Sequence, residues 1–289
     1  MLRALFELLR PHHWSKNLFC FAGAAFGPNR SRPWIHDALT FAVFCCVSSA
    51  VYVLNDVVDW KRDREHPRKR FRPIARGAVS VGGARVLASA LGVAGIFGGW
   101  LIGPAGFACV CLYLVNNLCY SLKLKHVALF DVLSISFGFV LRLLAGIYAV
   151  DDLPTTWIVL CVFFLSLFLG FGKRRAEIAA MVDAQNQETR PVLRQYPADF
   201  LDYLIRSSAI MAIMCYALFT TSGGKNPSLV ISVPIVFYAI MHYNRLLMTL
   251  RGGEEPERIL VSDRTLQASI VCWMACYLVI EHGHVHLFR

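Results

Sequence analysis

Long apolar stretches separated by short polar segments dominate the chain. A bilayer core is crossed by roughly 20 apolar residues in a helix, with a range of about 17–25. Nine stretches approach this length: 14–28, 36–56, 84–102, 105–121, 129–150, 156–173, 205–221, 228–248 and 265–283. None alternates like a membrane β-strand, and only helices or closed barrels satisfy the backbone in lipid. The pattern predicts an all-α integral membrane protein with nine transmembrane helices in a bundle, forming a single domain over residues 1–289.

The charge distribution orients this predicted bundle. Apolar residues make up 56% of the chain, against 45–50% in a typical soluble domain. With a cytosolic N-terminus, 24 of the 29 Lys and Arg residues lie in inner segments, four lie in outer segments, and Arg142 lies within a span. Positive charge gathers on the cytoplasmic side of membrane proteins. We therefore expect a multi-pass protein of the cell membrane with its C-terminus outside. The net charge of +10 follows first from this topology, and no nucleic-acid partner is expected.

An acidic motif lies at the end of the second predicted span. Asn55, Asp56, Asp59 and Asp63 follow the pattern N-D-x-x-D-x-x-x-D, and positions i, i+3 and i+7 share one helix face. Aligned carboxylates repel one another and need a cation. Hard oxygen ligands at a membrane rim suit Mg²⁺, which commonly binds through one or two carboxylates plus substrate phosphates. Mn²⁺ is the alternative metal. The plainer interpretation is that the acids pair with neighbouring cations at 61, 62 and 64. The added Asn and the third aligned Asp favour the metal.

Basic residues surround this motif and recur in the other inner loops. The stretch 64–77 carries six Lys and Arg residues and is interrupted by Pro67, Pro73 and Gly77, so it predicts a shaped loop. Its charge serves topology, and the same charge can bind a polyanion. Arg142 lies midway along a predicted span, where a charge costs at least ~2.5 kcal/mol and is usually functional or paired.

Four stretches together resemble one family of membrane enzymes. They are R-P-H-H-W-S-K-N at 10–17, the motif and loop at 55–77, Y-S-L-K-L-K at 120–125 with Asp131 and Arg142, and G-K-R-R-A-E at 172–177 with the late residues 256–257 and 262–264. The chain resembles the UbiA superfamily of intramembrane prenyltransferases and, within it, the decaprenyl-phosphate (polyprenyl-phosphate) phosphoribosyltransferases. The resemblance implies a nine-helix bundle whose active-site loops are cytosolic, at about 57–85, 121–128 and 173–206.

The resemblance also implies an activity and roles for particular residues. It implies Mg²⁺-dependent transfer of phosphoribosyl from 5-phosphoribosyl 1-diphosphate (PRPP) to a polyprenyl monophosphate in the bilayer, making a cell-envelope arabinan precursor. Asp56 and Asp59 would be catalytic, and Asn55, Asp56, Asp59 and Asp63 would hold the metal. The expected phosphate-binding residues are Lys16, Arg70, Arg72, Lys123, Arg142, Lys173 and Arg174. Glu177 is a further candidate, and a homo-oligomer is compatible with this family.

Two other functions stay open at this point. Aromatic prenyltransferases of the superfamily carry a second Asp-rich motif between spans 6 and 7, but here that loop mixes Glu177, Asp183, Glu188, Asp199 and Asp202 with bases. This departure disfavours an aromatic acceptor. A transporter would show internal repeats and broken helices near the midplane, whereas this chain shows no repeat and has its acids at the rim.

Overall fold

The computed structural model describes residues 2–22, 25, 32–67, 69–184, 191–222, 226–249, 259, 262–283 and 287. All regular secondary structure in these ranges is helical, which confirms the predicted all-α class. The α-helices are α1 (Leu2–Leu9), α3 (Ile35–Glu65), α4 (Val81–Ile102), α5 (Pro104–Leu122), α6 (Phe130–Ala149), α7 (Thr156–Ala184), α8 (Ala198–Ser222), α9 (Val233–Thr249) and α11 (Arg264–His282). The 3₁₀ helices are η1 (Pro11–Phe21), η2 (Lys69–Phe71), η3 (Leu124–His126), η4 (Pro191–Gln195) and η5 (Pro227–Ser232).

Seven helices of the described ranges are long and apolar enough to cross a membrane. They are Ile35–Glu65, Val81–Ile102, Pro104–Leu122, Phe130–Ala149, Thr156–Ala179, Ala198–Ser222 and Pro227–Thr249. The predicted spans 14–28 and 265–283 are not among the seven. The second of them coincides with α11, and the first overlaps η1 and extends beyond the described residues. The chain is thus a helical multi-pass membrane protein, and the count of nine stays a prediction.

The helix boundaries differ from the predicted spans at the polar ends. α3 continues beyond residue 56 through the whole acidic motif to Glu65, and α7 continues beyond 173 to Ala184. A tight turn joins α4 to α5, where Gly103 has φ 126° and Pro104 opens α5. Charged residues that the hydropathy pattern assigned to loops therefore lie on rigid helices.

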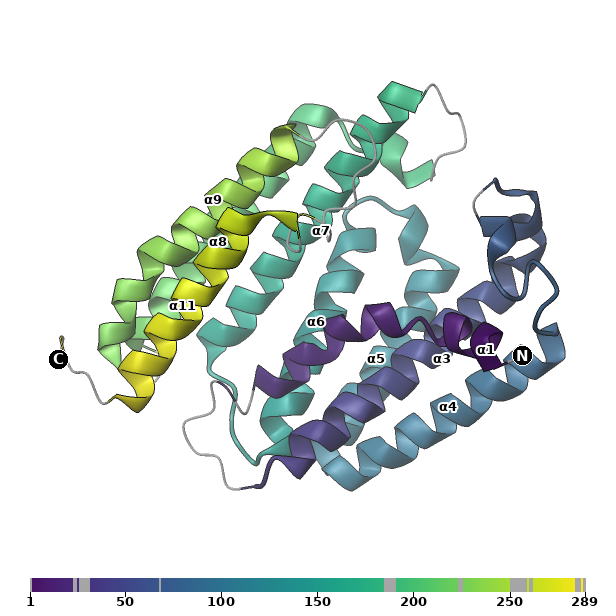
Figure 1. The fold of residues 1–289 in the computed structure, drawn as a ribbon, viewed down its shortest axis with the longest axis horizontal. Helices are drawn as coiled ribbons and strands as arrows, with labels where there is room; N and C mark the ends of the chain where they lie inside the picture. Colours follow the sequence, from purple (N-terminus) through teal and green to yellow (C-terminus); the bar gives the residue numbers. More distant parts are fainter. Residues whose placement is uncertain are drawn as a thin grey trace. The chain divides into compact units, whose positions relative to one another are not determined.

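The chain divides into two compact units. Unit 1 comprises residues 1–122 and 138–154, and unit 2 comprises 123–137 and 155–289. In unit 1, α3 packs along α4, which in turn packs on α5 (Figure 1). One buried cluster joins these helices to η1 and α6 through residues such as Phe44, Val110 and Leu141. A Cβ on Gly146 of α6 would lie 2.0 Å from the Cys20 carbonyl oxygen of η1, so only glycine permits this approach.

Unit 2 has a core of its own. α7 and α8 form its most extensive helix pair. Phe168 and Phe171 of α7, Leu201 and Ile205 of α8, and Tyr243 of α9 are buried together. The first residues of α6 also belong to this unit, and they carry Asp131 at their N-terminal end.

Candidate active site

The acidic motif of unit 1 lies on the last turns of α3. Asp56 and Asp63 are each 2% exposed, whereas Asp59 is half-buried. Asp59 makes no hydrogen bond or ion pair with the described residues. The carboxylates of Asp56 and Asp63 meet at one cation, because Arg72 Nη1 lies 3.0 Å from Asp56 Oδ1 and 2.8 Å from Asp63 Oδ2. The predicted alignment on one face is therefore present for Asp56 and Asp63.

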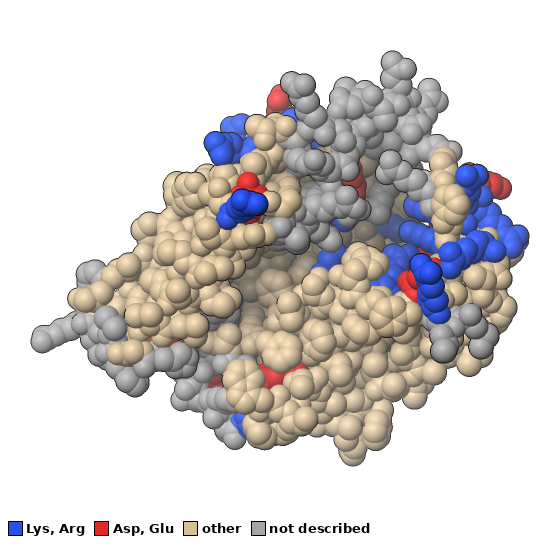
Figure 2. All heavy atoms as spheres, in the orientation of Figure 1, with Lys and Arg blue, Asp and Glu red and all other residues tan. Residues whose placement is uncertain are grey.

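The connection from α3 to α4 is folded, and this places Arg72. Ile74, Ala75 and Val79 are buried in a cluster with apolar residues of α3 and α4. The Arg64 Nε donates to the Ala75 carbonyl at 3.0 Å, and Ala78 and Val79 both donate to the Pro73 carbonyl. The interrupted basic loop is thus shaped as predicted. Figure 2 shows Lys and Arg side chains gathered over this connection.

Arg10 is a second cation on the same acidic face. Its Nη2 lies 2.6 Å from Asp56 Oδ1, and its guanidinium lies over the Tyr52 ring, 5.3 Å from the centroid. The neighbouring cations on α3 do not take this role, because Arg64 lies over Trp60 at 4.7 Å instead. Long-range pairs, rather than the local pairs of the plainer interpretation, therefore compensate the buried carboxylates.

Asn55 is oriented from another helix. The Ser121 hydroxyl at the end of α5 donates to Asn55 Oδ1 at 2.7 Å. This bond fixes the direction of the amide beside the acids. It also means that a metal ligated by Asn55 Oδ1 would share that oxygen with Ser121.

The arrangement fits Mg²⁺ that arrives together with a phosphate-bearing substrate. Carboxylate oxygens are the ligands Mg²⁺ prefers, and it commonly uses one or two of them plus substrate phosphates. Two carboxylates, those of Asp56 and Asp63, contact the same guanidinium nitrogen of Arg72, so both are directed to one position that a cation can occupy. Within the described residues, no group of three His, Cys, Asp or Glu side chains forms a complete cage. The donor set is therefore an open one, in which a substrate would complete the coordination.

Three other predicted phosphate-binding residues have accessible side chains. Arg70 is exposed, with its guanidinium over the Phe71 ring at 4.9 Å. Lys123 is exposed just before η3, and Lys16 of η1 is half-buried. Arg70 and Lys16 belong to unit 1, as the acidic motif does, whereas Lys123 opens unit 2.

Arg142 is buried among neutral groups. It is 5% exposed and donates to Asn17 Oδ1 at 2.7 Å, to the Gly138 carbonyl at 2.9 Å and to the Tyr113 hydroxyl at 2.7 Å. Its guanidinium also lies 4.6 Å from the Tyr113 ring centroid. In the described residues it has no carboxylate partner. This arrangement joins η1, α5 and α6 and favours a positioning role over the predicted phosphate contact.

A second polar cluster lies in unit 2, at the start of α6 and the end of α7. Arg174 is 2% exposed and Asp131 is 1% exposed. Arg174 Nε lies 2.7 Å from Asp131 Oδ2, and its Nη1 lies 2.6 Å from Glu177 Oε2. Two carboxylates thus bind Arg174, so a positioning role is favoured for it as well. Lys173, the preceding residue, is half-buried.

Tyr196 completes this second cluster. Its hydroxyl donates to Asp131 Oδ1 at 2.5 Å and accepts from the Leu129 backbone N–H at 2.7 Å. Burial, and then the hydrogen bond to Asp131, raise the pKa of the Tyr196 phenol, so it stays protonated as the donor. Sequence reasoning missed both Tyr196 and Arg10. Arg10 had a signal, since it opens the stretch 10–17, whereas Tyr196 had none.

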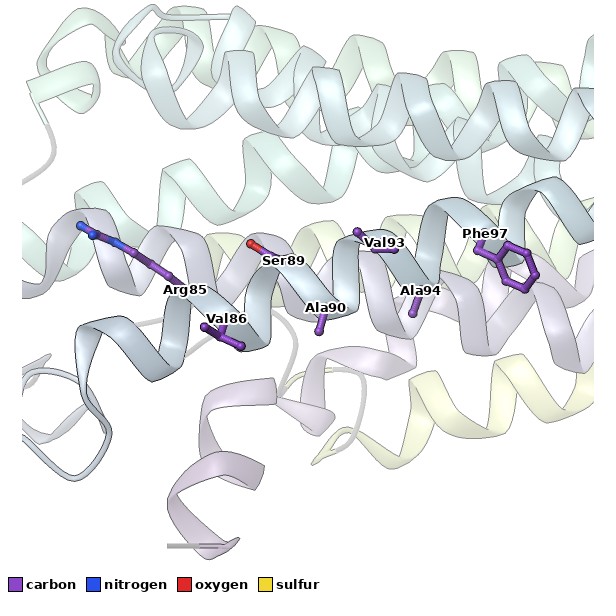
Figure 3. Close-up of a pocket in the computed structure, with 7 residues that line it drawn as sticks. All are labelled: Arg85, Val86, Ser89, Ala90, Val93, Ala94 and Phe97. Carbon is purple, nitrogen blue, oxygen red and sulfur yellow. The ribbon is translucent and has the colours of Figure 1, made fainter.

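A groove elsewhere in unit 1 is unrelated to this chemistry. Figure 3 shows its lining residues along one face of α4, from Arg85 to Phe97. All come from a single helix, and Arg85 is the one charged residue among them. The groove is too open and too apolar to organise a polar reaction.

Comparison with known proteins defines the class. The model of the UbiA prenyltransferase family matches residues 17–262, and the chain belongs to this family of membrane transferases. It is 33% identical over 285 residues to the decaprenyl-phosphate phosphoribosyltransferase of Mycobacterium tuberculosis, covering 95% of this chain and 93% of that protein. It is 34% identical over 287 residues to the protein of the same name from Corynebacterium glutamicum, covering 95% and 86%.

Solved structures show the same fold. A UbiA homologue from Archaeoglobus fulgidus bound to GPP and Mg²⁺ aligns with a TM-score of 0.75 at 17% identity, covering 96% of this chain and 99% of that one. Another structure of the same homologue aligns with a TM-score of 0.74. The predicted UbiA-like helical fold is therefore confirmed. The family match and the named relatives make the chain an enzyme rather than a transporter.

Proposed function

We propose that this protein transfers the 5-phosphoribosyl group of PRPP to a polyprenyl monophosphate and releases diphosphate, in an Mg²⁺-dependent reaction. The main support is the acidic face of α3. There the buried carboxylates of Asp56 and Asp63 both contact Arg72, and Asp56 also contacts Arg10. The names of relatives that match nearly the whole chain support the acceptor and the transferred group. The product would be a precursor of cell-envelope arabinan.

The acidic face would hold the metal with the donor's diphosphate. Asp56, Asp59 and Asp63 would be the metal ligands, with Asn55 oriented beside them by Ser121. When bound, Mg²⁺ would neutralise the charge that develops on the leaving diphosphate. Arg70 and Arg72 would bind phosphate oxygens through paired N–H donors. Lys16, which belongs to the same unit as the acidic face, is proposed for the remaining phosphate charge. The phosphate-binding roles of Lys123 and Lys173 stay predictions from the sequence.

The transfer itself exchanges one C–O bond for another. The bond from ribose C1 to the diphosphate breaks, and an oxygen of the lipid phosphate forms the new bond to C1. A phosphate monoester has a second pKa near 6, so it is already largely ionised at pH 7. No general base is then required. The protein would then have to position the donor and the lipid phosphate for attack at C1 and to stabilise the leaving diphosphate.

An aromatic acceptor is the main alternative, and the missing second Asp-rich motif argues against it. The segment that follows α7 mixes its acids with bases and has no D-x-x-x-D pattern. At the end of α7, Glu177 and Asp131 share one buried partner, Arg174.

The orientation and the nine-helix count form part of the proposal. The excess of Lys and Arg in the predicted inner segments supports a cytosolic N-terminus and an outer C-terminus. A cysteine introduced at 66 in a cysteine-free background should resist an impermeant thiol reagent, whereas one at 225 should react. Labelling at 66 from outside would reverse the orientation.

The function is tested directly with purified protein. Incubation with Mg²⁺, ribose-labelled PRPP and polyprenyl phosphate should move label into the lipid phase, and chelation of the metal should stop it. A parallel reaction offers a prenyl diphosphate and an aromatic acid. Prenylation of the aromatic acid without phosphoribosyl transfer would replace the proposal with the aromatic alternative.

A further inference from the structure

Arg10 has an unusual backbone for its position. Its φ and ψ are 53° and 58°, in the left-handed region, which residues with a side chain adopt at a free-energy cost. Pro11 follows it, and a residue before proline favours extended backbone. Such strain persists where the surrounding structure imposes it, and it concentrates at functional sites.

The surroundings of Arg10 hold this backbone on both sides. The Ser49 hydroxyl of α3 donates to the Leu9 carbonyl at 2.9 Å. The Arg10 N–H donates to the Glu7 carbonyl at 3.3 Å, and the Arg10 carbonyl accepts from the His13 N–H at 2.9 Å. The turn between α1 and η1 is thereby fixed against α3. Its effect is to direct the Arg10 side chain to the first aspartate of the motif.

One carboxylate oxygen receives two guanidinium groups as a result. Asp56 Oδ1 lies 2.6 Å from Arg10 Nη2 and 3.0 Å from Arg72 Nη1. A metal ion that uses this oxygen must compete with both cations. Arg72 has a second carboxylate partner in this structure, Asp63, at 2.8 Å. Arg10 would lose the one carboxylate that it contacts within the described residues.

We propose that Arg10 is a donor-site residue that changes partner. In the free enzyme it neutralises Asp56 and keeps that carboxylate in place. When Mg²⁺ and the donor bind, Asp56 becomes a metal ligand. The Arg10 guanidinium then leaves Asp56 and pairs with the donor's diphosphate. This inference rests on the proposed function for the identity of the diphosphate, but the competition for Asp56 does not.

The proposal predicts opposite effects on metal and donor. Without donor, removal of the Arg10 guanidinium takes away a competing cation, so Mn²⁺ used as a spectroscopic probe should bind several-fold tighter. With donor, the variant lacks a charged hydrogen bond to diphosphate, so KM for PRPP should rise about tenfold or more. A residue that only supported the fold would weaken both.

Arg10→Gly is the variant of choice, because glycine adopts left-handed backbone without strain. Arg10→Lys keeps the charge and should retain part of the donor affinity while losing the paired N–H geometry. Arg76→Ala is the matched control, since Arg76 lies on the basic loop 64–77 and pairs with Glu7 at 2.6 Å rather than with the acidic motif of α3. It should change neither property.

Electron paramagnetic resonance of Mn²⁺ with donor-free protein gives the first reading, and the lipid-phase transfer assay gives KM. Weaker Mn²⁺ binding by Arg10→Gly would show that Arg10 only supports Asp56 and would overturn the inference. An unchanged KM would remove the contact to diphosphate. If the wild type transferred no phosphoribosyl group, the proposed function and the donor half of the inference would both fail. The Mn²⁺ comparison would still decide whether Arg10 competes for Asp56.

Discussion

Replacing Arg174 with methionine should destabilise the protein far more than it weakens donor binding. Arg174 and Asp131 are buried, at 2% and 1% exposure, so the change leaves Asp131 as an uncompensated buried charge. Breaking such a pair costs about 3–5 kcal/mol. The hydrogen bond from Tyr196 to Asp131 remains and places the expected loss near the lower end, about 3 kcal/mol. The Glu177 carboxylate is 28% exposed and adds little.

The assay is thermal unfolding in detergent, paired with KM for PRPP. About 3 kcal/mol corresponds to a fall in Tm of roughly 6–12 °C for a chain of this size class. Arg175→Met is the matched control, because Arg175 pairs with Asp202 where both side chains are partly exposed, and such pairs contribute about 0–1 kcal/mol. Adding Asp131→Asn to Arg174→Met should restore much of the loss. An unchanged Tm with a large rise in KM would refute this reasoning and return Arg174 to the phosphate-binding set.

Two further changes test the packing of unit 1. Arg142→Met should lower Tm, because it leaves the buried Asn17 Oδ1 without its hydrogen-bond donor, at a cost of about 1–3 kcal/mol. KM for PRPP should stay near the wild-type value. A selective rise in KM would instead indicate a phosphate contact. Gly146→Ala should lower the free energy of unfolding by about 1–3 kcal/mol, because the added Cβ overpacks against a backbone carbonyl. Gly82→Ala is its control, since nothing lies within 4 Å of the added Cβ, and it should melt at or above the wild-type temperature. Equal melting of the two glycine variants would contradict the close approach at Gly146.

Local spacing in the sequence was enough to predict the acidic face. Positions 56 and 63 are two turns apart, so a continuous helix brings their carboxylates to one side, and both do contact the same nitrogen of Arg72. Spacing could not predict which cations would meet them. Arg10 is 46 residues from Asp56 and Arg72 is 16 residues away, so these pairs depend on tertiary packing. The cations nearest in sequence lie elsewhere.

The roles of buried arginines were harder to predict, for a related reason. Hydropathy ended the sixth predicted span at 173, because a charged run follows. α7 in fact continues to Ala184, and this continuation directs Arg174 toward Asp131 rather than toward solvent. At Arg142 the span was predicted, but its partners come from η1, α5 and its own helix. The periodicity of α6 could not reveal Asn17 and Tyr113, which lie on other elements.

The Mg²⁺ dependence of phosphoribosyl transfer by Asp56→Asn tests the central claim most directly. The amide keeps the shape and one oxygen but loses the charge that holds the metal. Transfer of label from PRPP to polyprenyl phosphate should nearly vanish for Asp56→Asn at every Mg²⁺ concentration. Asp199→Asn, an exposed acid at the start of α8, should match the wild type. Asp56→Asn that keeps wild-type activity and Mg²⁺ dependence, with only a lower Tm, would contradict a metal site on the acidic face of α3.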